Sequence, residues 1–194
     1  MENQNKGSIG GVEGGKEVTM VGKLKSKGAC DLLLRLLALV LTLSATIVLG
    51  VDKQTKIVQL KIAPSLPPLD VPATAKWHYL SACVFFVVSN AIACAYAALS
   101  VLLSVANRGG KKGLGMLFVI LDTLMVALLF SSIGATGSIG VMGYQGNSHV
   151  QWNKVCNVFG KFCNQVAASL VLSFLGSIAF MLLVMVATLR LHQK

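Results

Sequence analysis

The sequence predicts an all-α fold, an integral membrane four-helix bundle. Two observations indicate this class. The 194 residues are 55% hydrophobic and 12% charged, whereas soluble domains carry charge on about a quarter of their residues. Four apolar segments are each long enough to cross the bilayer core, which requires about 20 helical residues. We place the four spans at about 31–51, 79–105, 114–142 and 164–189.

Residues 1–28 precede the first span and read MENQNKGSIGGVEGGKEVTMVGKLKSKG. This segment is rich in glycine and charged residues and has no hydrophobic period. Such a composition buries too little apolar surface to offset the entropy of ordering the chain. We therefore predict a disordered cytoplasmic tail over 1–28, a membrane domain over 29–190 and a short cytoplasmic end at 191–194.

The first and third spans each contain a charge: Arg35 in DLLLRLLALVLTLSATIVLG and Asp122 in GMLFVILDTLMVALLF. An ionised side chain in hydrocarbon is costly, so such residues face the protein interior and pair. Arg35 lies seven residues beyond Gly28 and Asp122 nine beyond Gly113. At about 1.5 Å rise per residue, their depths differ by only roughly 3 Å. We predict an ion pair that fixes the packing of the two spans; the alternatives are partner recognition and a transport role for Asp122.

Small residues recur along the later spans. In a membrane, where no hydrophobic force drives helices together, small residues let helix backbones approach closely. The predicted helix-packing positions are Ala93 and Ala97 in the second span, Gly134, Gly137 and Gly140 in the third and, as a weaker signal, Gly176 in the fourth. Packing within the bundle and contact between subunits both fit this pattern.

Two outer loops connect the spans. The first, 52–78, contains prolines at 64, 67, 68 and 72, which favour an extended, non-helical path. The second, 143–163, contains the sequence WNKVCNVFGKFC. There we expect Trp152, Phe159 and Phe162 to form an aromatic surface.

The second loop also contains Cys156 and Cys163, seven residues apart. On a continuous helix, seven residues span about 10.5 Å, whereas the α-carbons of bridged cysteines lie within roughly 7 Å. Either the loop is helical with two free thiols, or it folds back and the two cysteines form a disulfide. The oxidising outer face favours the disulfide.

Basic residues determine the predicted orientation. In a four-span protein the amino tail, the inner loop 106–113 and the carboxyl end share one side of the membrane, and they hold ten basic residues against six in the outer loops. The positive-inside rule makes that side cytoplasmic. Lysines that face anionic membrane lipid explain the net charge of +10, so we predict membrane lipids and no nucleic acid as partners.

The sequence contains no Cys-x-x-Cys redox pair, zinc-ligand cluster, phosphate-binding loop or nucleophile elbow. We therefore predict no enzyme activity, no catalytic, metal-binding or cofactor-binding residue, and no cofactor. A membrane redox enzyme that uses Cys156 and Cys163 is an alternative for which no cofactor signature is present.

Together these residues resemble the plant Casparian strip membrane domain-like proteins. The resemblance rests on four spans with arginine in the first and aspartate in the third, and on a second outer loop of the form W-x-K-V-C-x-x-F-x-x-F-C. The segment FVVSNAIACAYAALSV also matches the F-x-V-x-N-A-I-x-x-x-Y pattern of their first subfamily. That family shares its four-span organisation and paired charges with the MARVEL membrane proteins.

The resemblance implies plasma-membrane residence, homodimers or higher homo-oligomers, and hetero-oligomers with related four-span proteins. Founding members form an immobile platform that recruits lignin-polymerising enzymes, so extracellular wall-modifying enzymes are implied partners. Those members carry a signature resembling E-S-L-P-F-F-T-Q-F, whereas this chain has DVPATAKWHYLSAC, and the barrier-forming role is not transferred. The expected function is a non-enzymatic scaffold that organises a membrane domain or cell-wall interface; a small oligomeric transporter or channel using Asp122 is the alternative.

Overall fold

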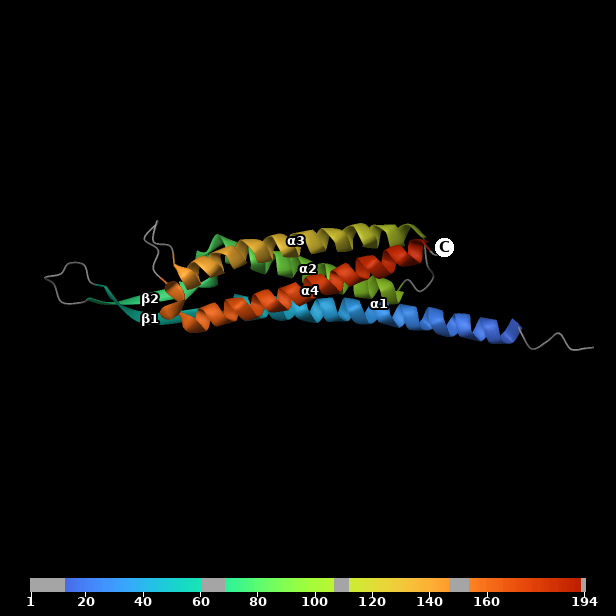
Figure 1. Cartoon of the computed structure of the whole chain (residues 1–194), viewed down its shortest axis with the longest axis horizontal. Coiled ribbons are helices and arrows are strands. Elements are labelled where there is room, and N and C mark those ends of the chain that lie inside the picture. Colours follow the sequence, from blue (N-terminus) through green and yellow to red (C-terminus); the bar gives the residue numbers. More distant parts are fainter. Residues whose placement is uncertain (1–12, 61–68, 107–111, 147–153, 193–194) are drawn as a thin grey trace, which may run out of the picture.

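The computed structural model describes residues 13–60, 69–106, 112–146 and 154–192, and in it four long helices lie side by side (Figure 1). The helices are α1 (Glu13–Gly50), α2 (Ser81–Ala106), α3 (Lys112–Gln145) and α4 (Gly160–His192). Strands β1 (Lys53–Leu60) and β2 (Leu69–Lys76) follow α1, and the short helices η1 (Trp77–Tyr79) and η3 (Val155–Asn157) precede α2 and α4. The predicted four-helix class is confirmed.

Each long helix contains a segment that is long and apolar enough to cross a membrane. These segments are Ala29–Gly50, Ser81–Ala106, Gly115–Gln145 and Gly160–Arg190. Large apolar side chains such as Leu33, Leu102 and Met116 are exposed on the outside of the bundle. A soluble monomer rarely exposes so much apolar surface, so the outside of the bundle suits contact with lipid.

Helix α1 begins earlier than the sequence analysis predicted. The disordered tail predicted for 1–28 is wrong for residues 13–28, which continue α1 as helix, while residues 1–12 lie outside the described part of the chain. Extending an existing helix adds one hydrogen bond for each residue fixed and needs no new nucleus. The apolar span supplies that nucleus, so the helix propagates through a segment whose composition would not start one.

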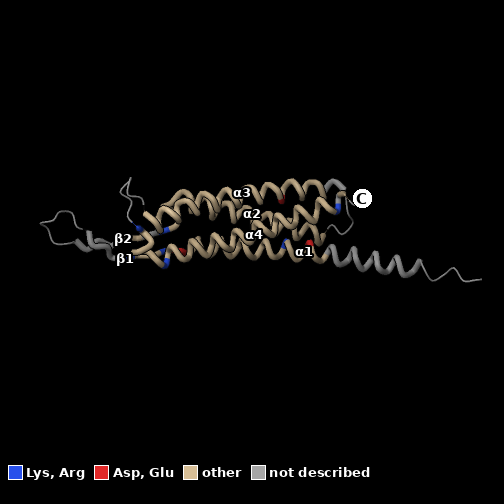
Figure 2. The backbone as a smooth tube through the Cα atoms, in the orientation of Figure 1, with Lys and Arg blue, Asp and Glu red and all other residues tan. Residues whose placement is uncertain are grey.

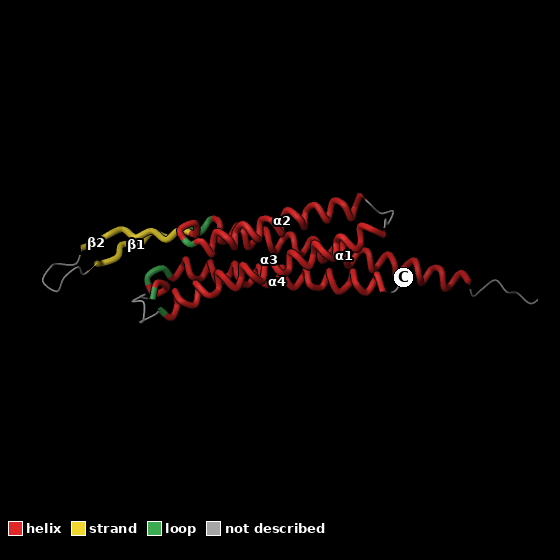
Figure 3. The backbone as a smooth tube through the Cα atoms, turned by 90° about the horizontal axis from the view of Figure 1, so that it is seen from above, coloured by secondary structure: helices red, strands yellow, loops and turns green. Residues whose placement is uncertain are grey.

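Strands β1 and β2 pair as an antiparallel ribbon, from Lys53 opposite Lys76 to Leu60 opposite Leu69. The prolines of this loop predicted an extended path, but the strand pairing was not foreseen. Pro72 lies within β2 opposite Ile57, which a two-stranded ribbon tolerates because both strands are edge strands. The ribbon continues the long axis of the bundle away from the helices (Figure 3); we call this end of the molecule the ribbon end.

The buried core extends along the bundle in two clusters. The first contains Ala38, Ala93, Ala97, Leu129, Ala179, Phe180 and Leu183. The second, toward the ribbon end, contains Ala45, Leu49, Cys83, Phe86, Phe159, Phe162 and Val166. The two alanines singled out in the sequence therefore lie between helices of the bundle.

The glycines of α3 do not share that position. At Gly134, Gly137 and Gly140 an added Cβ would meet no atom of a neighbouring described element within 4 Å, so these glycines are not packed inside the bundle. Gly176 of α4 is the glycine at a close helix contact, because a Cβ there would lie 3.2 Å from Cγ2 of Thr42 on α1. Glycine spacing along a helix shows that a small face exists but not toward which neighbour it turns.

Candidate functional site

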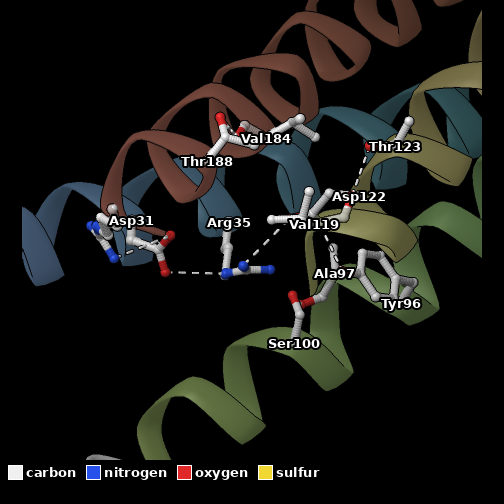
Figure 4. Close-up of polar contacts among 11 residues, drawn as sticks. Asp31, Arg35, Tyr96, Ala97, Ser100, Val119, Asp122, Thr123, Val184 and Thr188 are labelled. Atoms are coloured by element: carbon white, nitrogen blue, oxygen red, sulfur yellow. Dashed lines mark hydrogen bonds and ion pairs between the residues drawn. The ribbon is translucent and has the colours of Figure 1, made fainter. Parts of the chain in front are cut away.

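Arg35 of α1 and Asp122 of α3 meet inside the bundle, between two helices that lie diagonally across it from each other (Figure 4). Nη2 of Arg35 lies 3.5 Å from Oδ2 of Asp122. The side chains are 3% and 0% exposed respectively, so both charges are shielded from the surroundings of the bundle. The structure thus brings together the two intramembrane charges that the sequence analysis predicted to pair.

Each of the two groups has a second partner. Tyr96 on α2 donates a hydrogen bond of 2.6 Å from its hydroxyl to Oδ1 of Asp122. Nε of Arg35 donates to Oδ2 of Asp31, one helical turn earlier in α1, at 3.2 Å. The guanidinium carbon of Arg35 also lies 4.6 Å from the ring centroid of Phe118, a cation–π arrangement.

The fourth helix joins through the outer part of this cluster. Oδ1 of Asp31 lies 3.8 Å from Nη1 of Arg190, which is in the last turn of α4. The cluster therefore takes side chains from all four helices; we call it the polar clasp and define it as Asp31, Arg35, Tyr96, Asp122 and Arg190. Its two arginines and two aspartates give no net charge when all four are ionised.

The hydroxyl groups beside the polar clasp bond within their own helices. Nearby hydroxyls drawn in Figure 4 donate to carbonyls of their own helices: Ser100 to Ala97, Thr123 to Val119 and Thr188 to Val184. Such intrahelical bonds occupy the hydroxyl protons and leave none to continue a chain between helices. The arrangement suits a fixed crosslink of four helices better than a path for protons or ions.

At the ribbon end, Cys156 and Cys163 form a disulfide with their α-carbons 5.7 Å apart. The helix η3 ends at Asn157, and α4 begins at Gly160. The chain therefore folds back between the two cysteines, and the alternative of one continuous helix with two free thiols is wrong. Helix α4 begins at Gly160, four residues before the predicted start of span four, because the turn is completed within a few residues.

The predicted aromatic surface is not formed by the two phenylalanines. Phe159 and Phe162 are only 9% and 6% exposed and belong to the second core cluster, while Trp152 lies outside the described residues. The folded-back chain turns both rings inward. Burial of a phenylalanine side chain contributes roughly 1.5–3 kcal/mol to the free energy of folding. The backbone N–H of Phe162 donates to Oε1 of Gln54 at 2.9 Å, so β1 supplies an acceptor to the first turn of α4.

Asp52, between α1 and β1, was not singled out in the sequence. Its side chain is 1% exposed, and neither carboxylate oxygen has a hydrogen-bond partner among the described residues. Burial raises the pKa of Asp52 to about 6, and the positive charge of Lys161 opposes that shift without cancelling it. Nothing in the local sequence distinguishes this aspartate from an ordinary loop residue.

Sequence reasoning also missed three members of the polar clasp. Asp31 could have been found from its spacing of four residues before Arg35, which places the two side chains on one helix face. Tyr96 carried a weaker signal, a hydroxyl in the middle of an apolar span. Arg190 is one of several basic residues that flank spans and carried no distinguishing signal.

The chain is similar to plant membrane proteins. Residues 25–179 match the Casparian strip membrane protein domain. The chain is 62% identical to CASP-like protein 1E2 of Vitis vinifera over 197 residues, which cover 100% of each chain. It is 59% identical to CASP-like protein 1E1 of Populus trichocarpa, with 100% of this chain and 99% of the other covered. No solved structure matches the chain.

Proposed function

Because the chain belongs to the Casparian strip membrane protein family, we propose that it is a non-enzymatic scaffold of the plasma membrane. It assembles with copies of itself and with related four-span proteins, and it organises a membrane domain or a cell-wall interface. Its place among multi-pass plant membrane proteins follows from the family and from its four apolar helices. The scaffold role, the assembly and the plasma membrane are the proposal.

The polar clasp is the observation that carries this proposal. It joins all four helices through groups that partner one another, and the hydroxyls beside it bond within their own helices. A transport role for Asp122 would need this carboxylate to exchange partners. Both oxygens of Asp122 are already contacted, one by Arg35 and one by Tyr96, which supports a structural role.

The surface of α3 supports assembly. Of the four apolar segments, the one in α3 is the least buried within the bundle. A Cβ added at Gly134, Gly137 or Gly140 would meet no neighbouring atom within 4 Å. On such a small-residue face the backbone of another helix can approach closely. We therefore place the contact between subunits on the outward face of α3.

The proposed orientation puts both termini in the cytoplasm and the ribbon end outside. The start of α1 and the carboxyl end lie at the same end of the bundle, opposite the ribbon (Figure 1). The disulfide between Cys156 and Cys163 lies at the ribbon end, and disulfides persist in oxidising compartments rather than in the cytosol.

The experiment that tests the scaffold is subunit counting in neutral-lipid nanodiscs and in cells, with Gly134→Leu as the disrupting variant. We expect wild-type protein to form oligomers of limited mobility and Gly134→Leu to form smaller ones. Ala168→Leu adds the same side chain on an exposed face of α4 and serves as the matched control. A monomeric wild-type protein that diffuses freely in the cell would overturn the scaffold.

A further inference from the structure

Lysines gather at the ribbon end, where the sequence segments 51–80 and 144–163 together contain six lysines and two aspartates. Figure 2 shows this basic colouring where the ribbon meets the bundle. The lysine face, as we call it, consists of Lys53, Lys56, Lys76, Lys154 and Lys161. All of these side chains are exposed except that of Lys76, which is half-buried.

The acidic groups of this region do not neutralise the lysine face. Asp52 is 1% exposed, so its charge is withdrawn beneath the surface. Asp70 lies in β2 opposite Gln59, farther out along the ribbon than the Lys53–Lys76 pair. Within the described part of the chain, none of the five lysines lies within 4.0 Å of a carboxylate. The face therefore presents a positive field to water.

Two of these lysines lie where folding disfavours them. Lys53 is directly opposite Lys76 in the ribbon, and like charges in that relation are destabilising. Lys161 is the second residue of α4, at the positive end of the helix dipole, where a cation is also unfavourable. At Lys161 the attraction to buried Asp52 offsets part of this cost. A neutral residue in place of Lys53 would relieve the repulsion across the ribbon, so the charge of Lys53 points to a role outside the molecule.

The lysine face is held on a fixed framework. The hydrogen bond from Phe162 to Gln54 links α4 with β1, and the disulfide links α4 with η3. Lys56 is three residues farther along β1 than Lys53, about 10 Å at the usual rise of a strand. Because the ribbon extends the bundle axis (Figure 3), the charges continue away from the spans instead of circling them at one depth.

Exposed aromatic rings adjoin the same face. Tyr79 is 64% exposed, and Nζ of Lys76 lies 5.7 Å from its ring centroid. The ring of His78, also exposed, lies edge-on to Tyr79 at 4.7 Å. Flat rings beside cations fit a ligand that offers both C–H faces and anionic groups, as a carboxylated sugar ring does.

We propose that the lysine face is a docking surface for an acidic polysaccharide, a linear polymer with a carboxylate on successive sugar units. A lipid headgroup would satisfy lysines at one depth, whereas Lys56 lies about 10 Å farther along the ribbon than the opposed pair Lys53 and Lys76. An extended chain of regularly spaced carboxylates matches that spread. The inference rests on the proposed orientation, in which the ribbon end is outside the cell.

The test measures binding of polygalacturonate to the full-length protein in neutral-lipid nanodiscs, where both ends of the bundle are accessible. We expect saturable binding that weakens as salt is raised, because screening reduces attraction between charges. Replacing all five lysines of the face with Gln should weaken binding about tenfold or more. The matched control replaces Lys23, Lys25, Lys27, Lys111 and Lys112 with Gln, which changes the net charge equally, and should retain binding.

Three comparisons make the result decisive. Fully methyl-esterified polygalacturonate should not bind, because its carboxylates are neutral. If polyglutamate binds the protein as tightly as polygalacturonate does, a polysaccharide partner is overturned. If the protein binds nanodiscs that contain anionic lipid more tightly than it binds polygalacturonate, and this binding depends on the same five lysines, the face is assigned to lipid instead. A five-lysine variant with unchanged polygalacturonate affinity would also overturn the inference. Oligomer size is read separately, so the scaffold proposal survives or fails independently.

Discussion

The hydroxyl of Tyr96 donates a 2.6 Å hydrogen bond to Oδ1 of Asp122, the carboxylate oxygen that Arg35 does not contact. Asp122 is completely buried. With one oxygen held by a tyrosine of α2 and the other by an arginine of α1, this aspartate of α3 sets the spacing of three helices at once. The polar clasp thus differs from a simple ion pair, because its stability depends on a neutral donor as well as on charges.

Tyr96→Phe should destabilise the protein while leaving its shape intact. The ring remains but Oδ1 of Asp122 loses its donor, and leaving a buried acceptor unsatisfied costs roughly 1–3 kcal/mol. Thermal unfolding in nanodiscs, followed by circular dichroism, measures the loss. Tyr79→Phe is the control, because that side chain is 64% exposed. Equal melting temperatures for Tyr96→Phe and wild type would contradict the clasp.

Neutralising Arg35 or Asp122 alone should be more harmful than neutralising both. Each single variant, Arg35→Gln or Asp122→Asn, leaves a buried charge without its partner, which costs roughly 3–5 kcal/mol. The double variant removes both charges, so its loss of stability should be smaller than that of either single variant. Surface delivery and thermal stability of all four proteins form the double-mutant cycle. Additive losses would mean that the two side chains act independently.

Gly176→Leu should disturb the bundle, whereas Gly140→Leu should not. A Cβ at Gly176 already lies 3.2 Å from Thr42 and 3.6 Å from Leu41, so a larger side chain forces α1 and α4 apart, typically at a cost of about 1–3 kcal/mol. At Gly140 nothing lies within 4 Å of the added atom. Thermal stability distinguishes the two variants, and the opposite order would show that α1 and α4 are packed differently.

Asp52 should make the ribbon end less stable as pH rises. Its pKa is raised from 3.8 to about 6 in the folded protein, so the unfolded chain loses this proton at lower pH than the folded one. The stability that this group contributes is therefore fully present below about pH 4 and is lost as the pH rises from about 4 to 6. Above that range, Asp52 causes no further change in stability.

The variant Asp52→Asn isolates this contribution. Wild type and variant should be similar near pH 4, and the variant should be the more stable above pH 6. Comparing melting temperatures of the two proteins across that range removes the effects of other titrating groups. A difference that does not change with pH would exclude ionisation of Asp52 as the cause.

The pairing of Arg35 with Asp122 was predictable because the cost of a charge in hydrocarbon and the rise of a helix are both sequence-independent. Tyr96 was not, because its hydroxyl reaches Asp122 only at one rotation of α2, and that rotation is set by packing. The glycines of α3 failed in the same way, since their spacing fixes a face but not its direction. Phe159 and Phe162 were misassigned because their burial depends on the turn closed by the disulfide.

One further consequence comes from the amino-terminal part of α1. The helix begins at Glu13, but its apolar span begins at Ala29, and sixteen residues of helix extend about 24 Å. A partner that binds at the beginning of α1 would therefore be held by a stiff spacer at a set distance from the apolar span. In an assembly of many copies, such spacers would form a layer of uniform depth beside the membrane. Partners that bind in this layer would be positioned at a distance from the lipid headgroups.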